Sequence, residues 1–287
     1  MKYLIFITVV WAFSFSLIGE FLAGHVDSYF AVLIRVALAS IVFLPFTDFK
    51  NIKNTLKLKI ISIGIIQIGF MYIFFYKSFM FLSVPEVILF TIFTPLYITL
   101  FYDFLNKSFT PLYLISVSLA VLGAFIIRYQ GINSDFLIGF LLVQGANICF
   151  AIGQTSYKYL MQQEHTKNIP HSSIFGYFHF GALIISIIAF LAFGDFDKIS
   201  PSLTEWAVLF WLGLVASGLG YFLWNKGACK VDAGVLAIMN NALVPMGLLI
   251  NIVIWNKDVN YLTLSIGGSI IILSLWLHYF IMKRNVI

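Results

Sequence analysis

Ten long apolar stretches follow one another along this chain of 287 residues. A helix needs about 20 residues to cross about 30 Å of hydrocarbon. The stretches lie at approximately 3–20, 29–46, 60–80, 84–102, 111–129, 136–157, 172–193, 204–225, 233–255 and 261–282. Hydrophobic residues make up 61% of the chain and charged residues 10%, whereas soluble domains carry about 25% charged residues. The sequence therefore predicts an all-α membrane protein with ten transmembrane helices and the lipid bilayer as its solvent.

One segment of the chain occurs twice. Residues 69–95 and 218–245 both begin with Gly, continue with an aromatic run and end with Pro. The matched pairs are Tyr72 with Tyr221, Lys77 with Lys226, and Pro95 with Pro245. We therefore expect two five-helix repeats, at residues 1–130 and 136–284. Because five is an odd number, the two repeats are predicted to insert with opposite orientations, as in secondary transporters.

The basic residues predict the orientation of the chain. With the N-terminus inside, twelve of the 17 Lys and Arg residues fall in inner loops, three fall in outer loops, and Arg35 and Lys77 fall in helices. Basic residues mark the cytoplasmic side of a membrane, so both termini are expected in the cytoplasm and the protein in the bacterial inner membrane. The net charge of +5 is explained in the same way and does not indicate a nucleic-acid partner.

Several of these features resemble one known family. They are the run WAFSFS at residues 11–16, Arg35 in the second helix, and the two Tyr-to-Pro hairpins. Together with ten helices and the repeat, they resemble the ten-helix, EamA-type branch of the drug/metabolite transporter superfamily. The resemblance implies transport of small metabolites without ATP. It also implies a central cavity lined mainly by the third, fourth, eighth and ninth helices, with contributions from the first and sixth. Residues 11–35 are similar to transporters of carboxylates and amino acids, and specifically to the bacterial biotin-transporter branch.

Each charged residue within the predicted helices has two interpretations, because ionisable groups in a membrane are costly. Arg35 lies about six residues, roughly 9 Å, into the second helix. Its guanidinium either binds a substrate carboxylate or pairs with Glu20 or Glu86. Lys77 and its repeat mate Lys226 are either anion-binding or gating residues near opposite faces, or they reach the headgroups.

The acidic residues give no clear proton pathway. Glu86 follows Pro85 at the start of the fourth helix, where a carboxylate suits the helix N-terminus. Alternatively, Glu86 takes part in proton coupling or in gating of the transporter. The same alternative applies to Glu20. No Asp or Glu is predicted near the bilayer centre, so facilitated diffusion and exchange both stay open.

Neutral polar and aromatic residues are predicted to complete the site. In the sixth helix, Gln144, Asn147, Gln154 and Lys158 share one helical face, which either lines a cavity or bonds across a helix interface. Asn240 and Asn241 in the ninth helix occupy places equivalent to Thr91 and Thr94 in the fourth, where a polar part of a substrate could be bound. The candidate aromatic walls are Trp11, Tyr72, Tyr221 and Trp224.

These residues favour a secondary transporter for a small organic carboxylate. The preferred substrate is biotin, and the preferred direction is uptake into the cell. The carboxylate would be held by Arg35 or Lys77, and amino acids fit less well because their ammonium group needs a buried acceptor. The alternatives are an exporter of amino acids or amphiphilic drugs, a lipid flippase and a membrane enzyme. We expect no cofactor, metal site or catalytic constellation, and the sequence leaves the oligomeric state open.

Overall fold

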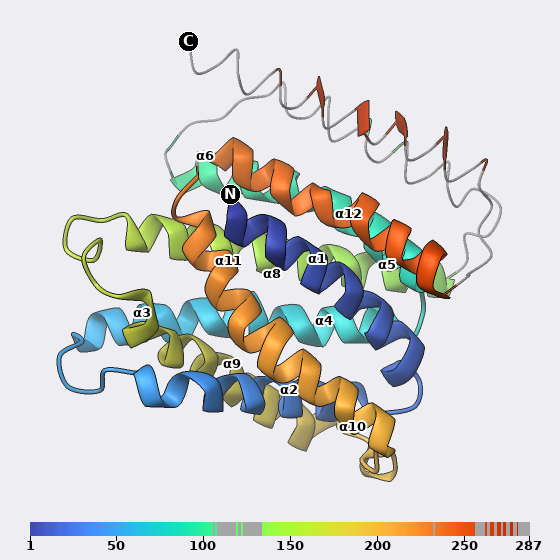
Figure 1. The fold of residues 1–287 in the computed structure, drawn as a ribbon, viewed down its shortest axis with the longest axis horizontal. Coiled ribbons are helices and arrows are strands. Elements are labelled where there is room, and N and C mark those ends of the chain that lie inside the picture. Colours follow the sequence, from blue (N-terminus) through green and yellow to red (C-terminus); the bar gives the residue numbers. More distant parts are fainter. Residues whose placement is uncertain are drawn as a thin grey trace.

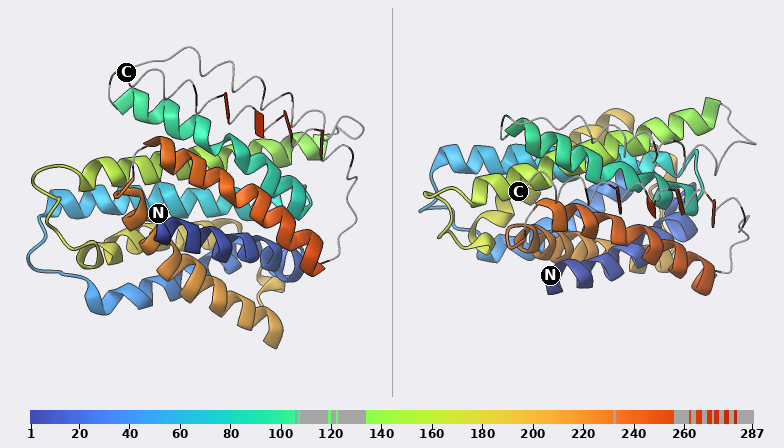
Figure 2. Two further views of the ribbon diagram at one scale, coloured as in Figure 1. Left: turned by 45° about the horizontal axis from the view of Figure 1, so that its top comes forward. Right: turned by 90° about the horizontal axis from the view of Figure 1, so that it is seen from above.

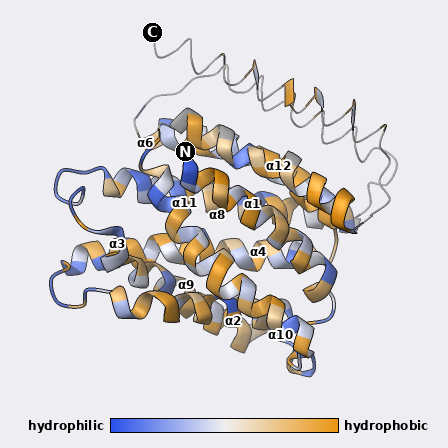
Figure 3. Ribbon diagram, viewed as in Figure 1, coloured by the Kyte–Doolittle hydropathy of each residue, from blue (hydrophilic) through white to orange (hydrophobic). Residues whose placement is uncertain are grey.

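The computed structural model describes residues 1–105, 134–231 and 233–255, together with isolated positions near 107–122 and between 262 and 280. All elements in these ranges are helices. Seven helical segments are long and apolar enough to cross a membrane: Lys2–Leu22, Ser28–Phe46, Asn54–Ser78, Val84–Leu105, Asp135–Met161, His171–Phe193 and Leu203–Ala228. Hydrophobic residues run along these helices and hydrophilic residues gather in the connecting loops (Figure 3). The all-α membrane architecture is confirmed.

These segments match the predicted spans. The ninth predicted span coincides with the helix Ala233–Trp255, whereas the fifth and tenth, at 111–129 and 261–282, lie outside the described residues. The third helix begins at Asn54, although the apolar stretch begins near residue 60. The reason is that Leu56 and Ile60 are buried, whereas Lys59 is exposed and Lys57 donates to the backbone oxygen of Phe49, so the helix begins with an amphipathic turn.

Several membrane-crossing helices change their winding along their length. The first consists of α1 (Lys2–Leu17) and a π-helical turn η1 (Ile18–Leu22), and the second of α2 (Ser28–Phe43) and η2 (Leu44–Phe46). The third comprises α3 (Asn54–Gly64), π-helical η3 (Ile65–Phe70) and α4 (Met71–Ser78), and the fourth α5 (Val84–Phe90), 3-10 helical η4 (Thr91–Phe93) and α6 (Thr94–Leu105). The others are α8 (Ser134–Met161), α9 (His171–Phe193), η6 (Phe196–Lys198), α10 (Leu203–Phe210), π-helical η7 (Trp211–Leu219), α11 (Gly220–Ala228) and α12 (Ala233–Trp255).

Local sequence signals set the helix starts. Asp27 caps α2 by accepting a hydrogen bond from the backbone of its first turn. Ser83 with Glu86, and Ser202 with Glu205, form capping boxes at the starts of α5 and α10. These side chains satisfy backbone N–H groups that have no partner inside the helix.

The helices run roughly along one direction, with the connecting loops gathered at two ends (Figures 1 and 2). The helix α9 packs against α2 and α3, and α8 packs against η3, α4 and α6. On the other side, α1 packs against α12 and α11, while α2 packs against η7. Helices from both predicted repeats therefore alternate around a shared centre.

Two glycines bring α3 and α9 close together. A Cβ on Gly64 would lie 1.8 Å from the carbonyl oxygen of Phe178, and a Cβ on Gly181 would lie 2.1 Å from that of Ile61. Small residues let membrane helices approach until their backbones touch. These two glycines therefore set the distance between the third and seventh helices.

The two copies of the repeated segment meet at the centre of the molecule. The π-helical turns η3 and η7 lie just before Tyr72 and Tyr221, and the rings of these two tyrosines are 5.8 Å apart. In Figure 1, the third helix, α3–α4, and the eighth, α10–α11, run in opposite directions. The matched tyrosines, π-turns and helix directions agree with inverted repeats.

Candidate functional site

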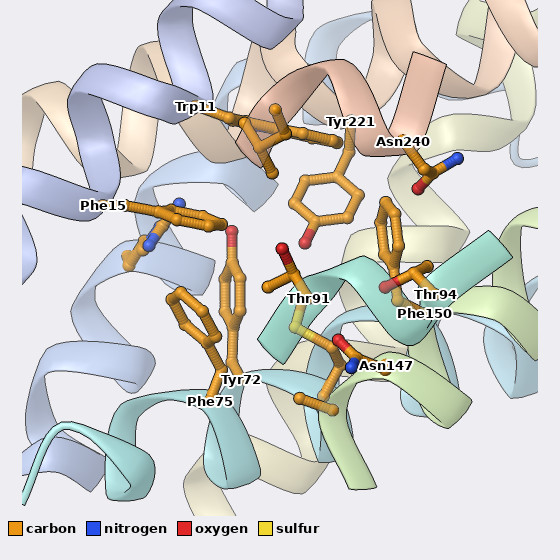
Figure 4. A pocket seen from close by; sticks show the side chains of 14 residues that line it. Trp11, Phe15, Tyr72, Phe75, Thr91, Thr94, Asn147, Phe150, Tyr221 and Asn240 are labelled. Atoms are coloured by element: carbon orange, nitrogen blue, oxygen red, sulfur yellow. The ribbon is translucent and has the colours of Figure 1, made fainter. Parts of the chain in front are cut away.

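A cavity of about 560 Å³, including its opening, lies where these helices converge (Figure 4). The lining residues are Trp11, Phe15, Arg35, Met71, Tyr72, Phe75, Thr91, Thr94, Ala146, Asn147, Phe150, Tyr221, Asn240 and Leu243. They come from the six helices that the resemblance implied and also from the second helix, which contributes Arg35.

Arg35 is buried at one side of the cavity, with 3% of its surface exposed. Its Nε donates to Ser217 Oγ, and its Nη1 donates to the Tyr76 hydroxyl at 3.1 Å. Its guanidinium carbon lies 4.3 Å from the centroid of the Tyr72 ring, a cation–π contact. Tyr72 in turn shares a hydrogen bond of 2.8 Å with Ser217. Within the described part of the chain, all partners of this cation are neutral.

An aromatic wall adjoins Arg35. The Trp11 ring lies 5.0 Å from that of Tyr221 and 5.7 Å from that of Phe150. Trp11 is held in place because its Nε1 donates to the backbone oxygen of Ala216, in the π-turn η7, at 2.8 Å. Phe15 and Phe75 rest against each other at 4.8 Å and lie on the same side of the cavity as Tyr72 (Figure 4). This wall can cover an apolar chain or a ring.

Amide side chains bound the cavity on its other side. Asn147 Nδ2 donates to the backbone oxygen of Phe90 at 2.8 Å. Asn240 Nδ2 donates to the backbone oxygen of Leu236 at 2.8 Å, and Asn240 exchanges longer hydrogen bonds with Gln154. Figure 4 shows Asn147, Thr94 and Asn240 on one side of the cavity and Tyr72, Phe15 and Phe75 on the other. The cavity therefore has a cationic side and an amide side.

Seven of the predicted site residues line the cavity, namely Trp11, Arg35, Tyr72, Thr91, Asn147, Tyr221 and Asn240. Three predicted binding residues lie elsewhere. Lys77 stands over the Tyr29 ring at 5.0 Å, Trp224 lies behind Trp11 and donates to Gln154 at 3.0 Å, and Asn241 is buried outside the lining. Trp224 therefore supports the wall from behind.

The predicted gating or coupling residues lie near the helix ends. Glu86 accepts hydrogen bonds of 2.8 Å from the backbone and hydroxyl of Ser83, which is a capping role. Lys226 lies in the last turn of α11, with its Nζ 5.5 Å from the Phe222 ring. Glu20 lies in the π-turn η1. Their part in gating stays a prediction.

The polar face of the sixth helix is explained mostly by helix contacts. Gln144 accepts a hydrogen bond from the Tyr97 hydroxyl at 3.1 Å, and Gln154 bonds to Asn240. Lys158 Nζ donates to the backbone oxygens of Ala228 and Val231, where a cation suits the C-terminus of α11. Of this face, Asn147 is the residue that lines the cavity.

Sequence reasoning missed Ser217, which holds Arg35 from the second repeat. The signal available was its position directly before the repeated segment that begins at Gly218. It also missed Phe15, Phe75 and Phe150, because 31 Phe residues make any single one uninformative. Thr94 was noted for its equivalence to the asparagines, and it does line the cavity.

The EamA-like transporter family matches this chain over residues 1–129 and 137–280. A probable biotin transporter of Pseudomonas aeruginosa is 50% identical over 97% of this chain and 97% of its own length. The biotin transporters of Escherichia coli K12 and Salmonella typhimurium are each 48% identical over 97% of this chain and 92% of their own. A solved crystal structure, 15% identical, has the same fold, with a TM-score of 0.69 over 99% of this chain and 96% of that chain.

Proposed function

The chain belongs to the EamA-like transporter family, and from this membership we propose that it carries biotin into the bacterial cell across the cytoplasmic membrane. Transport would proceed without ATP, by alternating access of two inverted five-helix repeats, at residues 1–130 and 136–284, around the central cavity. The biotin transporters that share about half of their residues with this chain support the substrate. Both termini would be cytoplasmic.

The buried Arg35 carries the proposal that the substrate is a carboxylate. A cation inside a membrane protein is costly unless an anion or hydrogen bonds compensate it. In the described part of the chain, Ser217, Tyr76 and the Tyr72 ring compensate it only with neutral groups. A substrate carboxylate beside the guanidinium would complete this compensation through charge-assisted hydrogen bonds.

The remaining walls suit the rest of such a molecule. The apolar chain and thioether ring of biotin would lie against Trp11, Tyr221 and Phe150, which form a continuous aromatic surface. An amino acid fits less well, because its ammonium group would find no carboxylate among the described lining residues. The cavity thus favours a carboxylate with an apolar body over a zwitterion.

Uptake of labelled biotin at nanomolar concentration, in cells that cannot synthesise it, tests the proposal. Arg35→Gln removes the cation and should raise the KM for biotin by about a hundredfold, since a hydrogen bond to a charged group is worth about 1.5–3 kcal/mol. Arg35→Lys should recover only part of this loss, because an ammonium cannot reproduce the planar guanidinium.

The matched control is Lys77→Gln, which removes a second cation from the same half of the chain. Lys77 does not line the cavity, so this variant should keep the wild-type KM. The proposal is contradicted if the wild-type protein, shown to be in the membrane, gives no biotin uptake, or if Arg35→Gln transports biotin normally.

A further inference from the structure

The amide of Asn147 presents its oxygen to the cavity. Both hydrogens of its Nδ2 are engaged, by the backbone oxygen of Phe90 at 2.8 Å and by Gln144 Oε1 at 3.2 Å. A backbone carbonyl can only accept, so this contact fixes which end of the amide faces the protein. Asn147 Oδ1 makes no hydrogen bond within the described part of the chain, and Figure 4 shows it directed to the cavity side.

Two neighbouring groups also offer lone pairs. The Thr91 hydroxyl donates its single hydrogen to the backbone oxygen of Ile88 at 2.6 Å, so its oxygen can only accept from the cavity. Asn240 is oriented in the same way as Asn147, because its Nδ2 donates to the backbone oxygen of Leu236. Its oxygen accepts one hydrogen bond, from Gln154, and an amide oxygen has two lone pairs.

The two sides of the cavity therefore have opposite hydrogen-bonding character. On the first side, Arg35 can only donate, and the hydroxyl groups of Tyr72 and Ser217 are bonded to each other beside it. On the second side, the donors of Asn147, Thr91 and Asn240 point into the protein and their acceptors point outward. A substrate that satisfies both sides must be an acceptor at one end and a donor at the other.

We infer that Asn147, Thr91 and Asn240 form an acceptor site that selects carboxylates whose opposite end bears N–H groups, as a cyclic urea does. This inference rests on the proposed function, since it assigns the second half of the same cavity. The hydroxyl of Thr94, which also lines the cavity, could donate to the carbonyl of such a head group. Asn147 is the principal acceptor, because its amide oxygen accepts no hydrogen bond within the described part of the chain, whereas the oxygen of Asn240 already accepts one from Gln154.

The inference predicts how the transporter discriminates between ligands. A carboxylate without N–H groups would leave these acceptors without partners, which costs about tenfold to a hundredfold in affinity for each one that is desolvated. Sites built to hydrogen-bond a substrate reject analogues that lack the bonding group more strongly than they reject analogues of altered apolar size. N–H groups should therefore matter more than the thioether ring.

Competition for uptake of labelled biotin by the wild-type protein tests this directly. Dethiobiotin keeps the cyclic urea and loses the thioether ring, whereas lipoate keeps the pentanoate tail of biotin and has no N–H group. We expect dethiobiotin to compete within about tenfold of biotin and lipoate to compete at least about a hundredfold more weakly. Lipoate competing as well as dethiobiotin overturns the inference.

Substitution of Asn147 tests whether this residue is responsible for the selectivity for biotin over lipoate. Asn147→Leu should raise the KM for biotin at least about tenfold while leaving inhibition by lipoate unchanged, so that the selectivity for biotin over lipoate shrinks. The control Tyr97→Phe removes a hydrogen bond to Gln144 in the same network without removing an acceptor from the cavity, and should keep the selectivity. Unchanged selectivity in a membrane-inserted Asn147→Leu protein overturns the assignment, and if that variant does not insert, the wild-type ligand series decides.

The two proposals fail in different ways. Absence of biotin uptake by the wild-type protein contradicts the proposed function itself. Biotin uptake that depends on Arg35 but is inhibited equally by lipoate leaves the proposed function standing and contradicts the acceptor site alone.

Discussion

At the scale of single residues, the site depends on how Arg35 is held. Arginine has five donors in a fixed planar fork. Ser217 takes Nε and Tyr76 takes Nη1, while the donors of Nη2 find no acceptor in the described part of the chain. The protein thus fixes the plane of the guanidinium from one side and leaves the other side for an anion. Ser217 is a positioning residue, since it acts through Arg35 and does not line the cavity.

Ser217→Ala is expected to weaken transport without removing the cation. The loss of a hydrogen bond to a charged group costs about 1.5–3 kcal/mol, so the KM for biotin should rise by about tenfold to a hundredfold while kcat changes little. The control is Ser186→Ala, another buried serine, whose hydroxyl donates within its own helix to the backbone oxygen of Ala182 at 2.7 Å. Equal KM values for the two variants would show that Arg35 does not need Ser217.

The sequence was informative for those site residues that are unusual in a membrane. Arg35, Asn147 and Asn240 stand out because polar groups in helices at this depth need an explanation, and all three line the cavity. Asn241 satisfied the same criterion and lies outside the cavity lining. The difference is one of helical rotation, since Asn240 and Asn241 are adjacent and point in different directions. Rotation depends on helix packing, which a single sequence does not contain.

At the scale of elements, the π-helical turns are the feature that the sequence did not reveal. In η3 and η7 the winding loosens before Tyr72 and Tyr221, and π-turns are frequent at functional sites. Each turn rotates the following helix relative to a regular α-helix and so directs its tyrosine. In an apolar run, no polar residues recur at the helical period, so the sequence gives no sign of such a change in helical rotation. The helix ends were predictable, because Ser83 with Glu86 and Ser202 with Glu205 are sequence-level capping signals.

The crossing of α3 and α9 should be sensitive to a single methyl group. Gly64→Ala places a Cβ where the backbone oxygen of Phe178 lies 1.8 Å away, so the helices must move apart. Overpacking of this kind costs about 1–3 kcal/mol, measurable as a lower Tm of the purified protein in detergent. Gly145→Ala is the control, because the atoms nearest to its Cβ would be those of the Phe74 ring, at 3.2 Å, and a ring can move. A Tm for Gly64→Ala no lower than that for Gly145→Ala would contradict the predicted crossing.

At the scale of the whole molecule, the repeated segment was the strongest predictor of architecture. It paired Tyr72 with Tyr221 from sequence alone, and the two rings meet at the cavity 5.8 Å apart. The all-α fold followed from composition, and the family matches the chain in two ranges, residues 1–129 and 137–280. The repeat did not predict the asymmetry of the site. Arg35 comes from the first copy and its partner Ser217 from the second, so the two sides of the cavity carry different groups although the two copies share one pattern.

The same architecture makes a prediction about orientation. The loop at 47–53 and the loop at 162–170 lie at one end of the molecule, and the loop at 194–202 lies at the other (Figure 1). The first end carries most of the loop lysines, so the positive-inside rule places it in the cytoplasm. Single cysteines at exposed Lys53, Lys167 and Lys198 can test this in a background that lacks Cys149 and Cys229.

A membrane-impermeant maleimide applied to intact cells should label Lys198→Cys and leave Lys53→Cys and Lys167→Cys unmodified. After the membrane is permeabilised, all three should react, which serves as the internal control for accessibility. The prediction follows from charge, because each lysine in a translocated loop must be moved against the preference of basic residues for the cytoplasmic side. Labelling of Lys53→Cys or Lys167→Cys in intact cells would reverse the orientation.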